Sequence, residues 1–475
     1  MKNYHPLFAG ILYAAGNILI KAIPFLTLPL FTRLMPASDF GVYHTYLAYE
    51  TIGSILLGFG MAGTVRIAIT QYPDRFEEYV SAMYGVQAVI AAFAYLLLPV
   101  FWHFYKQDGW LTPELSVLLL SNCMGMQIFN IASAKYAIEG EVKRNLCLSF
   151  LMSGLNVCMS LFFCLRVYPA YAYKGRIYGT CFSALIPAAL AAVWQKRKSS
   201  CWYHPQFWKF SLRMGSPLIL HSLSLTVLSQ CDKIMIQSME GSKKAGVYSL
   251  AVTLSSVLGV IVTSADNAWA PWFFERLRRR DFLEIERKNS YMIMAFGFLS
   301  ILTVLVSPEL IRLMSPQEYW DSARCFPILL LSVFFGFLYI IPVNLEYYHK
   351  KTGYIAVTTA VAAVLNVACN YVFIRAFGFA GAAYATCVSK FLLFVLHWKR
   401  AFKIEKIKLA DARYIVFCIL AVTAVSVFTV WQEKGAVYRY SMLAVMLYAC
   451  WMLFRHSGII EKIFVRKNKK GAGKK

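Results

Sequence analysis

The nine residues Gly175–Ser183, GRIYGTCFS, recur 206 positions later as Gly381–Ser389, GAAYATCVS, with five identical residues. Gly-Val-Tyr at 41–43 recurs at 246–248, and Leu-Asn-Val at 155–157 recurs at 365–367. Because the offsets are similar and the order is kept, we predict one ancestral unit copied in tandem. The copies lie inside long apolar runs. In a protein with many membrane spans, such a repeat is typical of a transporter whose pathway lies between two related halves.

The composition predicts an all-α integral membrane protein. Hydrophobic residues make up 59% of the 475 residues, which is too apolar for a soluble chain of this size. They form repeated runs of about 20 residues, the length that crosses hydrocarbon as a helix. We predict fourteen spans, near residues 8–31, 40–61, 79–102, 115–134, 146–165, 177–194, 210–236, 247–274, 291–311, 325–347, 355–374, 380–398, 414–431 and 440–454.

The repeat divides these spans into two lobes. Residues 1–195 form a first six-helix lobe, 196–206 a polar cytoplasmic linker, and 207–400 a second six-helix lobe. Residues 401–475 add spans thirteen and fourteen and a basic cytoplasmic tail, and have no partner copy. An even number of spans in each lobe keeps both copies in the same orientation. The pseudo-twofold axis is therefore expected to run along the membrane normal.

The charge pattern sets the expected orientation and excludes one class of partner. The chain carries 48 Lys and Arg against 24 Asp and Glu, a net charge of +24. The basic runs follow alternate loops, as they do in cytoplasmic loops of membrane proteins, so we expect both termini in the cytoplasm. Anionic lipid headgroups explain these runs better than nucleic acid does. Membrane lipids are expected partners, and nucleic acid is not.

Motifs of known catalytic and cofactor sites are missing from the sequence. It contains no Walker A motif, no His-Glu-x-x-His and no Gly-x-Ser-x-Gly, and its twelve cysteines include no Cys-x-x-Cys pair. GFGMAG at 58–63 matches the dinucleotide fingerprint as a string, but it follows an apolar span and not a strand. We interpret it as close helix packing. No enzymatic activity, cofactor or metal is predicted.

Ionisable residues inside spans are the best candidates for a transport site, because a charge at the centre of a helix in lipid costs at least ~2.5 kcal/mol. Lys21 lies one helical turn after Asn17, and Lys390 lies in the middle of span twelve. A mid-span lysine must face an aqueous cavity or pair with a carboxylate. The acidic and histidine candidates are Glu50 in span two, His221 within span seven, Asp232 at its outer end, and Asp266 in span eight. Structural pairing for Glu50 and Asp266, and a hydrogen-bonded interior role for His221, are the alternatives.

Several segments resemble bacterial polysaccharide-export flippases. They are LTLPLFTRLMPASDFGVY at 26–43, QCDKIM at 230–235, AGVYS at 245–249, AWAPW at 268–272, and the block from Leu365 to Thr386. The resemblance implies the fold shared by multidrug, oligosaccharidyl-lipid and polysaccharide exporters. It also implies residence in the bacterial cytoplasmic membrane and flipping of an undecaprenyl-pyrophosphate-linked oligosaccharide repeat unit to the outer leaflet by alternating access. Polysaccharide polymerase or assembly proteins are expected partners.

The resemblance and the buried charges together suggest roles for the candidates. A pyrophosphate would need cationic partners in a low-dielectric cavity, for which we choose Lys21, Lys390 and Arg66, with Asn17 beside them. Glu50, Asp266, Asp232 and His221 are candidates for exchange of a coupling ion, H⁺ or Na⁺. A cation-coupled drug or metabolite exporter of the same fold and a peptidoglycan lipid-precursor flippase remain alternatives. A membrane glycosyltransferase or polymerase fits less well, since no Asp-x-Asp motif or long outer loop is present.

Overall fold

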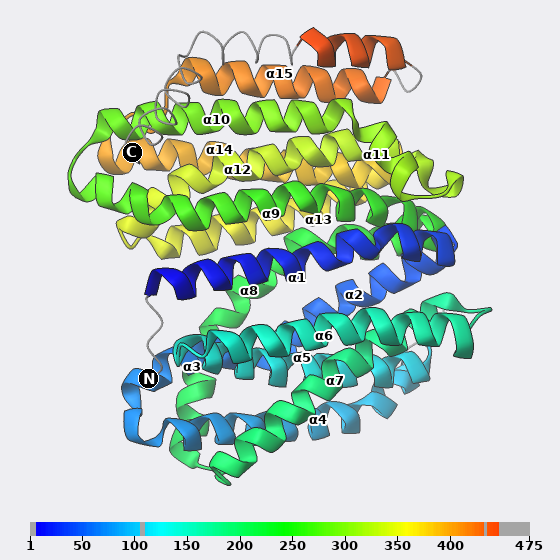
Figure 1. Cartoon of the computed structure of the whole chain (residues 1–475), viewed down its shortest axis with the longest axis vertical. Coiled ribbons are helices and arrows are strands. Elements are labelled where there is room, and N and C mark those ends of the chain that lie inside the picture. Colours follow the sequence, from blue (N-terminus) through cyan, green and yellow to red (C-terminus); the bar gives the residue numbers. More distant parts are fainter. Residues whose placement is uncertain (1–5, 105–109, 432–434, 446–475) are drawn as a thin grey trace, which may run out of the picture.

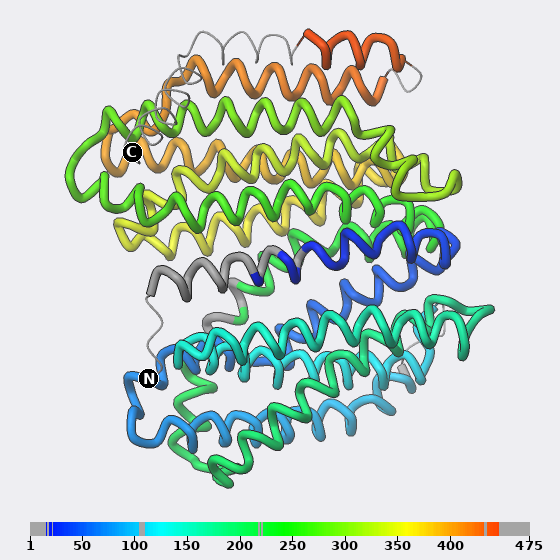
Figure 2. The backbone as a smooth tube through the Cα atoms, viewed as in Figure 1, coloured from blue at the N-terminus to red at the C-terminus, as the bar shows by residue number. Residues whose placement is uncertain are grey.

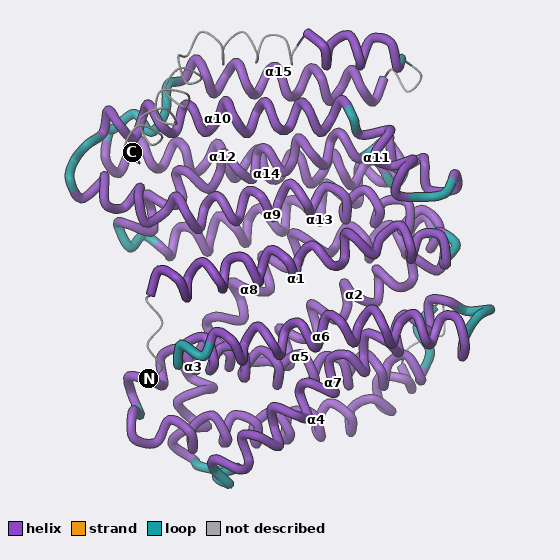
Figure 3. Tube along the Cα trace, in the orientation of Figure 1, coloured by secondary structure: helices purple, strands orange, loops and turns teal. Residues whose placement is uncertain are grey.

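The computed structural model of the chain describes residues 6–104, 110–431 and 435–445 (Figure 2). Within these ranges the backbone alone is described for residues 6–15, 17, 18, 21, 104, 217, 218, 220 and 221. All regular structure in this part of the chain is helical, and it contains no strand (Figure 3). The predicted all-α class is confirmed.

The first half of the chain forms seven α-helices and two short turns of other helix types. Their bounds are α1 (Pro6–Leu34), α2 (Ala37–Gly58), α3 (Met61–Gln71), η1 (Pro73–Arg75), α4 (Phe76–Phe104), α5 (Pro113–Ile138), α6 (Val142–Phe162), the π-helical η2 (Phe163–Val167) and α7 (Ala172–Lys198). Prolines and caps set several ends. Pro36 separates α1 from α2, and the Thr112 hydroxyl accepts a hydrogen bond from the Leu115 amide at the start of α5.

The second half follows after the loop of residues 199–204. Its bounds are α8 (Pro205–Glu240), α9 (Ser242–Arg278), α10 (Phe282–Leu305), α11 (Ser307–Met314), η3 (Gln317–Arg324), α12 (Phe326–Tyr348), α13 (Thr352–Phe377), α14 (Ala380–Glu405) and α15 (Ala412–Trp431). Eleven helices of the described chain are long and apolar enough to cross a membrane. They coincide with predicted spans. Most of the last predicted span, 440–454, lies outside the described residues.

Two predicted span boundaries are wrong. The span at 291–311 is broken at Val306, because Pro308 cannot continue the hydrogen-bond ladder of α10 and begins the short helix α11 instead. The span at 210–236 continues to Glu240, so Asp232 and Lys233 lie two turns inside α8 and are buried. Only the break at Gly241, with φ of 85°, ends this helix.

The helices form two bundles that Figure 1 shows one above the other. The first bundle contains α2 to α7, with contacts among α2, α4, α5, α6 and α7. The second contains α9 to α15, in which α12 packs on α14 and α10 on α15. α1 lies between them and contacts α6 of one bundle and α9 of the other. α8 crosses from one bundle to the other, from Ser211, which bonds to Thr64, to Cys231, which bonds to Asn366.

The bundles meet where α2 crosses α9, and the crossing uses the repeated Gly-Val-Tyr motif. A Cβ atom on Gly41 would overlap the backbone oxygen of Ser242, and one on Gly246 would overlap that of Ala37. The two equivalent glycines thus face each other across the interface, and each removes a side chain so that the helices can touch. On α1, shortly before α2 begins, the Thr32 hydroxyl donates a hydrogen bond to the carbonyl of Met314 on α11 at 2.7 Å.

Glycines of the 58–63 string also serve packing. A Cβ on Gly58 would meet the Gln127 side chain, and Gly60, with φ of 66°, forms the corner between α2 and α3 against the backbone of Gly215. No strand precedes the string in the described chain. The close-packing interpretation agrees with this geometry.

Candidate functional site

A cavity of about 310 Å³ lies in the first bundle, walled by α1, α2, α5, α6 and α7, with Thr253 of α9 also lining it. Phe31, Phe40, Leu47 and Met152 are among its apolar lining residues. The polar side chains that line it are Thr27, Tyr43, His44, Glu50, Asn122, Ser153, Asn156, Arg176, Thr180 and Ser183. A mostly apolar hollow with a few polar groups is the usual form of a small-ligand site.

Arg176 of α7 is the charged group in this cavity that sequence reasoning missed. Its side chain is buried, with 8% of the residue exposed. The guanidinium carbon lies 3.6 Å from the centre of the Phe31 ring and 5.0 Å from that of Tyr43, and Nη1 donates to Asn156 Oδ1 at 3.1 Å. No ion pair to Arg176 occurs in the described part of the chain. The equivalent position in the other copy of the repeat is Ala382, so the arginine is not part of the repeated pattern.

Glu50 lies in the same cavity, two turns along α2 from Tyr43. It is 9% exposed and accepts a hydrogen bond from Ser54 Oγ at 2.9 Å. No cation pairs with it among the described residues. The cavity therefore holds one buried guanidinium and one buried carboxyl group, and neither has an ion-pair partner in the described part of the chain.

Asp232 of α8 is the centre of a second polar cluster, in the other bundle. Its carboxylate accepts hydrogen bonds from Tyr248 Oη at 2.6 Å, Thr386 Oγ1 at 2.8 Å and Asn370 Nδ2 at 3.0 Å. These donors come from α9, α14 and α13, so one carboxylate ties four helices together. Lys390 lies one turn after Thr386 on α14, close enough for its charge to interact with Asp232. The structure thus brings two predicted residues, Asp232 and Lys390, into one region.

The two clusters are built on equivalent repeat positions. In the first bundle Tyr43 Oη lies 3.1 Å from Thr180 Oγ1, to which Asn156 also donates at 3.2 Å. In the second, Tyr248 and Thr386 occupy the corresponding positions and both donate to Asp232. Both copies therefore use the same tyrosine and threonine positions. The charged side chain beside them is Arg176 in the first copy and Asp232 in the second.

The remaining predicted residues lie apart from these clusters or outside the described side chains. Asp266 of α9 accepts a hydrogen bond from Asn344 of α12 at 2.8 Å. Arg66 is exposed on α3 and does not line the cavity. Asn17, Lys21 and His221 occupy α1 and α8, but their side chains lie outside the described residues.

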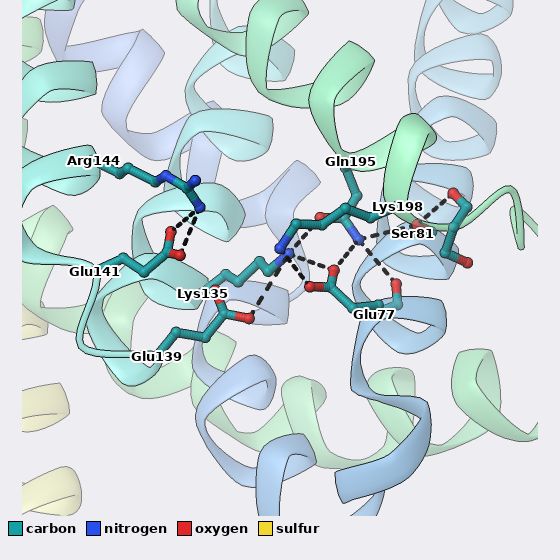
Figure 4. A network of polar contacts seen from close by, with 9 residues as sticks. Glu77, Ser81, Lys135, Glu139, Glu141, Arg144, Gln195 and Lys198 are labelled. Carbon is teal, nitrogen blue, oxygen red and sulfur yellow. Dashed lines mark hydrogen bonds and ion pairs between the residues drawn. The ribbon is translucent and has the colours of Figure 1, made fainter. Parts of the chain in front are cut away.

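A polar network at the end of the first bundle was not predicted. Figure 4 shows Glu77 of α4 between Lys135 of α5 and Lys198 of α7, with Gln195 of α7 hydrogen-bonded to both Glu77 and Lys135. Lys135 Nζ donates to Gln195 Oε1 at 2.8 Å, and its side chain is only 3% exposed. Three helices are therefore fixed to one another at this end. The residues are far apart in the sequence, so no local pattern could identify the network.

Metal-binding chemistry has no candidate among the residues that the structure describes. No group of three or more His, Cys, Asp and Glu side chains there is arranged to hold a metal ion. The eleven cysteines of this part are all free.

Comparison with known proteins identifies the family. Residues 9–276, more than half of the chain, match the family of polysaccharide biosynthesis proteins. The chain belongs to this family. Residues 217–372 also match the MatE family. A Haemophilus influenzae protein of the Lsg locus is 21% identical over 372 residues, covering 76% of this chain and 89% of that protein. An uncharacterized membrane protein of the same organism is 20% identical, covering 74% and 87%.

Solved structures share the fold at low identity. The lipid II flippase MurJ, in an inward closed conformation, superposes with a TM-score of 0.74 at 11% identity, covering 96% of this chain and all of that one. An inward-facing MATE multidrug transporter of the MOP superfamily gives 0.62 at 14% identity, covering 81% and 96%. The chain therefore has the fold of MATE transporters and of MurJ, and its long apolar helices support a multi-pass membrane protein.

Proposed function

We propose that this protein flips an undecaprenyl-pyrophosphate-linked oligosaccharide repeat unit from the cytoplasmic to the outer leaflet of the bacterial cytoplasmic membrane, for surface polysaccharide synthesis. Both termini lie in the cytoplasm, residues 1–195 and 207–400 act as the two lobes, and alternating access moves the substrate. The family match and the likeness to a lipid II flippase support this substrate class. Polymerase or assembly proteins would receive the flipped unit.

The observation that carries the proposal is Arg176. A guanidinium that is buried without an ion pair is costly, unless a ligand supplies the missing negative charge. Its planar fork suits a phosphate oxygen pair, and the aromatic rings of Phe31 and Tyr43 hold it in place without neutralising it. The pyrophosphate of the lipid carrier would supply the anion. Further contacts to the substrate along the transport path are proposed for Lys390 and for Lys21 with Asn17 on α1. Arg66 is exposed, so it would contact the substrate only at the end of the path.

The acidic residues are proposed to exchange the coupling ion. The Asp232 carboxylate accepts hydrogen bonds from three neutral donors. It would bind H⁺ or Na⁺ in place of one of these hydrogen bonds. Glu50 and Asp266 are second candidates, and His221 is a third. Replacing Glu50 or Asp266 with the neutral isostere should change the ion or pH dependence of transport. If the dependence stays as in the wild type, their roles are structural.

One observation favours a different substrate. Glu50 lines the same cavity as Arg176, and the MatE match covers residues 217–372. A carboxylate in a largely apolar cavity would suit an organic cation, as in a cation-coupled drug exporter. A peptidoglycan lipid-precursor flippase would use the same pyrophosphate chemistry, and the sugar alone distinguishes it from the first proposal.

The test compares binding of a lipid with and without the anion. Purified full-length protein in detergent is titrated with undecaprenyl pyrophosphate and with undecaprenol, and binding is followed by tryptophan quenching. Arg176→Gln should weaken pyrophosphate binding by about 10- to 100-fold, because charge-assisted hydrogen bonds contribute about 1.5–3 kcal/mol. It should leave undecaprenol binding unchanged. The control is Arg413→Gln, which makes the same change at an arginine whose side chain is 89% exposed.

Two results would reject the assignment. Equal pyrophosphate affinity in the wild type and Arg176→Gln would remove Arg176 from the site. Binding of a lipophilic cation such as ethidium that requires Glu50, with no preference for pyrophosphate over undecaprenol, would favour the drug exporter.

A further inference from the structure

Glu346 of α12 and His397 of α14 form a fully buried pair in the second bundle. Both side chains are 0% exposed, and His397 Nδ1 lies 2.9 Å from Glu346 Oε1. On the opposite side of the ring, Nε2 lies 2.8 Å from Thr358 Oγ1 of α13. One imidazole therefore links three helices. The pair is separate from the cavity of the first bundle and from the cluster around Asp232.

The hydrogen bonds around the ring require a proton between His397 and Glu346. Thr358 Oγ1 lies 2.8 Å from the carbonyl oxygen of Tyr354 and 3.1 Å from that of Ile355, so its proton can point to its own helix. In that orientation the Thr358 oxygen accepts from His397 Nε2–H. A second proton then lies between His397 Nδ1 and Glu346 Oε1. Either His397 is an imidazolium beside a carboxylate, or it is a neutral imidazole beside a carboxylic acid. In both forms the pair is neutral overall.

Removal of one proton changes the bonding on both sides of the ring. The remaining ring proton must face Glu346 from Nδ1, because a carboxylate cannot donate. Nε2 then becomes an acceptor, and the Thr358 hydroxyl must turn from its own helix to donate to it. The pair would carry one negative charge in the protein interior, and Glu346 Oε2 has no hydrogen-bond partner among the described residues. Such a buried, uncompensated charge destabilises the packing around it.

Among the described residues no cation forms an ion pair with Glu346. The rings of Tyr339 of α12 and Tyr354 of α13 lie 5.0 and 5.5 Å from that of His397, and Tyr347 of α12 is close enough to interact with Glu346. The charged groups nearby are Arg400 of α14, whose guanidinium lies 5.0 Å from the Tyr354 ring, Lys390 two turns before His397, and Asp232 of α8. Asp232 bonds to Thr386, about three helical turns from His397. The proton is therefore the species that neutralises Glu346 locally.

We propose that Glu346 and His397 form a proton-binding site that controls how α12 packs against α13 and α14. Binding or loss of that proton would change the net charge of the pair by one unit and the hydrogen bond between His397 and Thr358. A shift of α12 can be transmitted to the interface between the bundles. Asn344, two residues before Glu346, bonds to Asp266 of α9, and α9 contacts α2. The site does not depend on the identity of the transported substrate.

The first bundle provides an internal control. There Lys135 and Glu77 link α5 to α4, with Lys198 of α7 also paired to Glu77. Lysine stays charged between pH 5 and 8, so this network is not expected to respond to pH in that range. It is a buried polar link between helices without an imidazole.

The experiment measures thermal unfolding of the purified full-length protein in detergent from pH 5.5 to 8.5, by tryptophan fluorescence. The wild-type midpoint should fall as the pH rises, because the empty site leaves a buried charge. The double variant Glu346→Gln/His397→Gln removes both titrating groups and should flatten this dependence, with a difference from the wild type in the folded-to-unfolded ratio of up to about tenfold per pH unit for one proton. Glu77→Gln should lower the midpoint about equally at every pH and keep the wild-type slope.

A second variant covers the case in which the double variant does not fold. Glu346→Gln leaves no carboxyl group to hold the proton against His397, so its midpoint should not fall as the pH rises. The proposal is overturned if either variant keeps the wild-type fall of the midpoint with pH. Neither result would bear on pyrophosphate binding at Arg176, so the two proposals fail separately.

Discussion

Replacing Gly246 with alanine should separate the two bundles where α2 crosses α9. The added methyl group would overlap the carbonyl oxygen of Ala37 and lie 3.0 Å from the backbone nitrogen of Gly41. These are backbone atoms that cannot rotate away, so α9 must move off α2. Overpacking of this kind costs about 1–3 kcal/mol, against a gain of about 1 kcal/mol from the helix propensity of alanine.

Gly259 supplies the matched control on the same helix. A Cβ there meets nothing within 4 Å, so Gly259→Ala should gain the propensity term without a clash. The two variants should therefore differ by about 1–3 kcal/mol in the free energy of unfolding. The assay is unfolding of the purified protein in mixed micelles with increasing SDS, followed by tryptophan fluorescence. Gly41→Ala, which overlaps Ser242 from the other side, should behave like Gly246→Ala.

The reasoning is refuted if Gly246→Ala is as stable as Gly259→Ala. That result would mean that α2 and α9 do not approach each other as closely as the structure places them. It would also remove the physical reason for finding Gly-Val-Tyr in both copies of the repeat.

Two further predictions concern buried and partly buried carboxylates. Asp232→Asn keeps the shape of the side chain but replaces one acceptor oxygen with an amide donor that faces existing donors. It should lower the free energy of unfolding by about 1–3 kcal/mol in the same assay. Unchanged stability would show that the three donors bond elsewhere. Burial alone would raise the pKa of Glu309 on α11, but Arg439 and Tyr440 hold it below its ordinary value. The stability from this pairing should therefore be present at neutral pH and disappear as the pH falls below about 4, so that Glu309→Gln is destabilising at pH 7 and equal to the wild type at pH 3.

The fold could be predicted from the sequence because its main determinants are local or periodic. Apolar runs of membrane-spanning length predicted the helices, and the repeat predicted related halves, whose equivalent glycines meet at the α2–α9 crossing. The errors occurred where one residue changes the backbone. Pro308 splits the span at 291–311, and the length of α8 beyond Lys233 depends on where Gly241 ends it.

The candidate site could be predicted only in part. Charge inside a predicted span drew attention to Glu50 and Lys390, since the cost of burying a charge is visible in a single helix. Asp232 was predicted at the end of a span, and only the structure shows that it is buried inside α8. Arg176 was missed because a span-end arginine in sequence is indistinguishable from one that turns into a cavity. Its environment of Phe31, Tyr43 and Asn156 comes from α1, α2 and α6 and exists only after folding.

The sequence by itself determined that the chain is helical and crosses a membrane many times, and it predicts a duplicated unit, because hydropathy and repetition are properties of the order of residues. The tertiary structure alone decided which charges are neutralised. Glu346 and His397 are 51 positions apart and unremarkable in their spans, yet they share a proton site in the interior. Charge pairing depends on distances of a few ångströms between helices, and the packing of the bundles sets those distances.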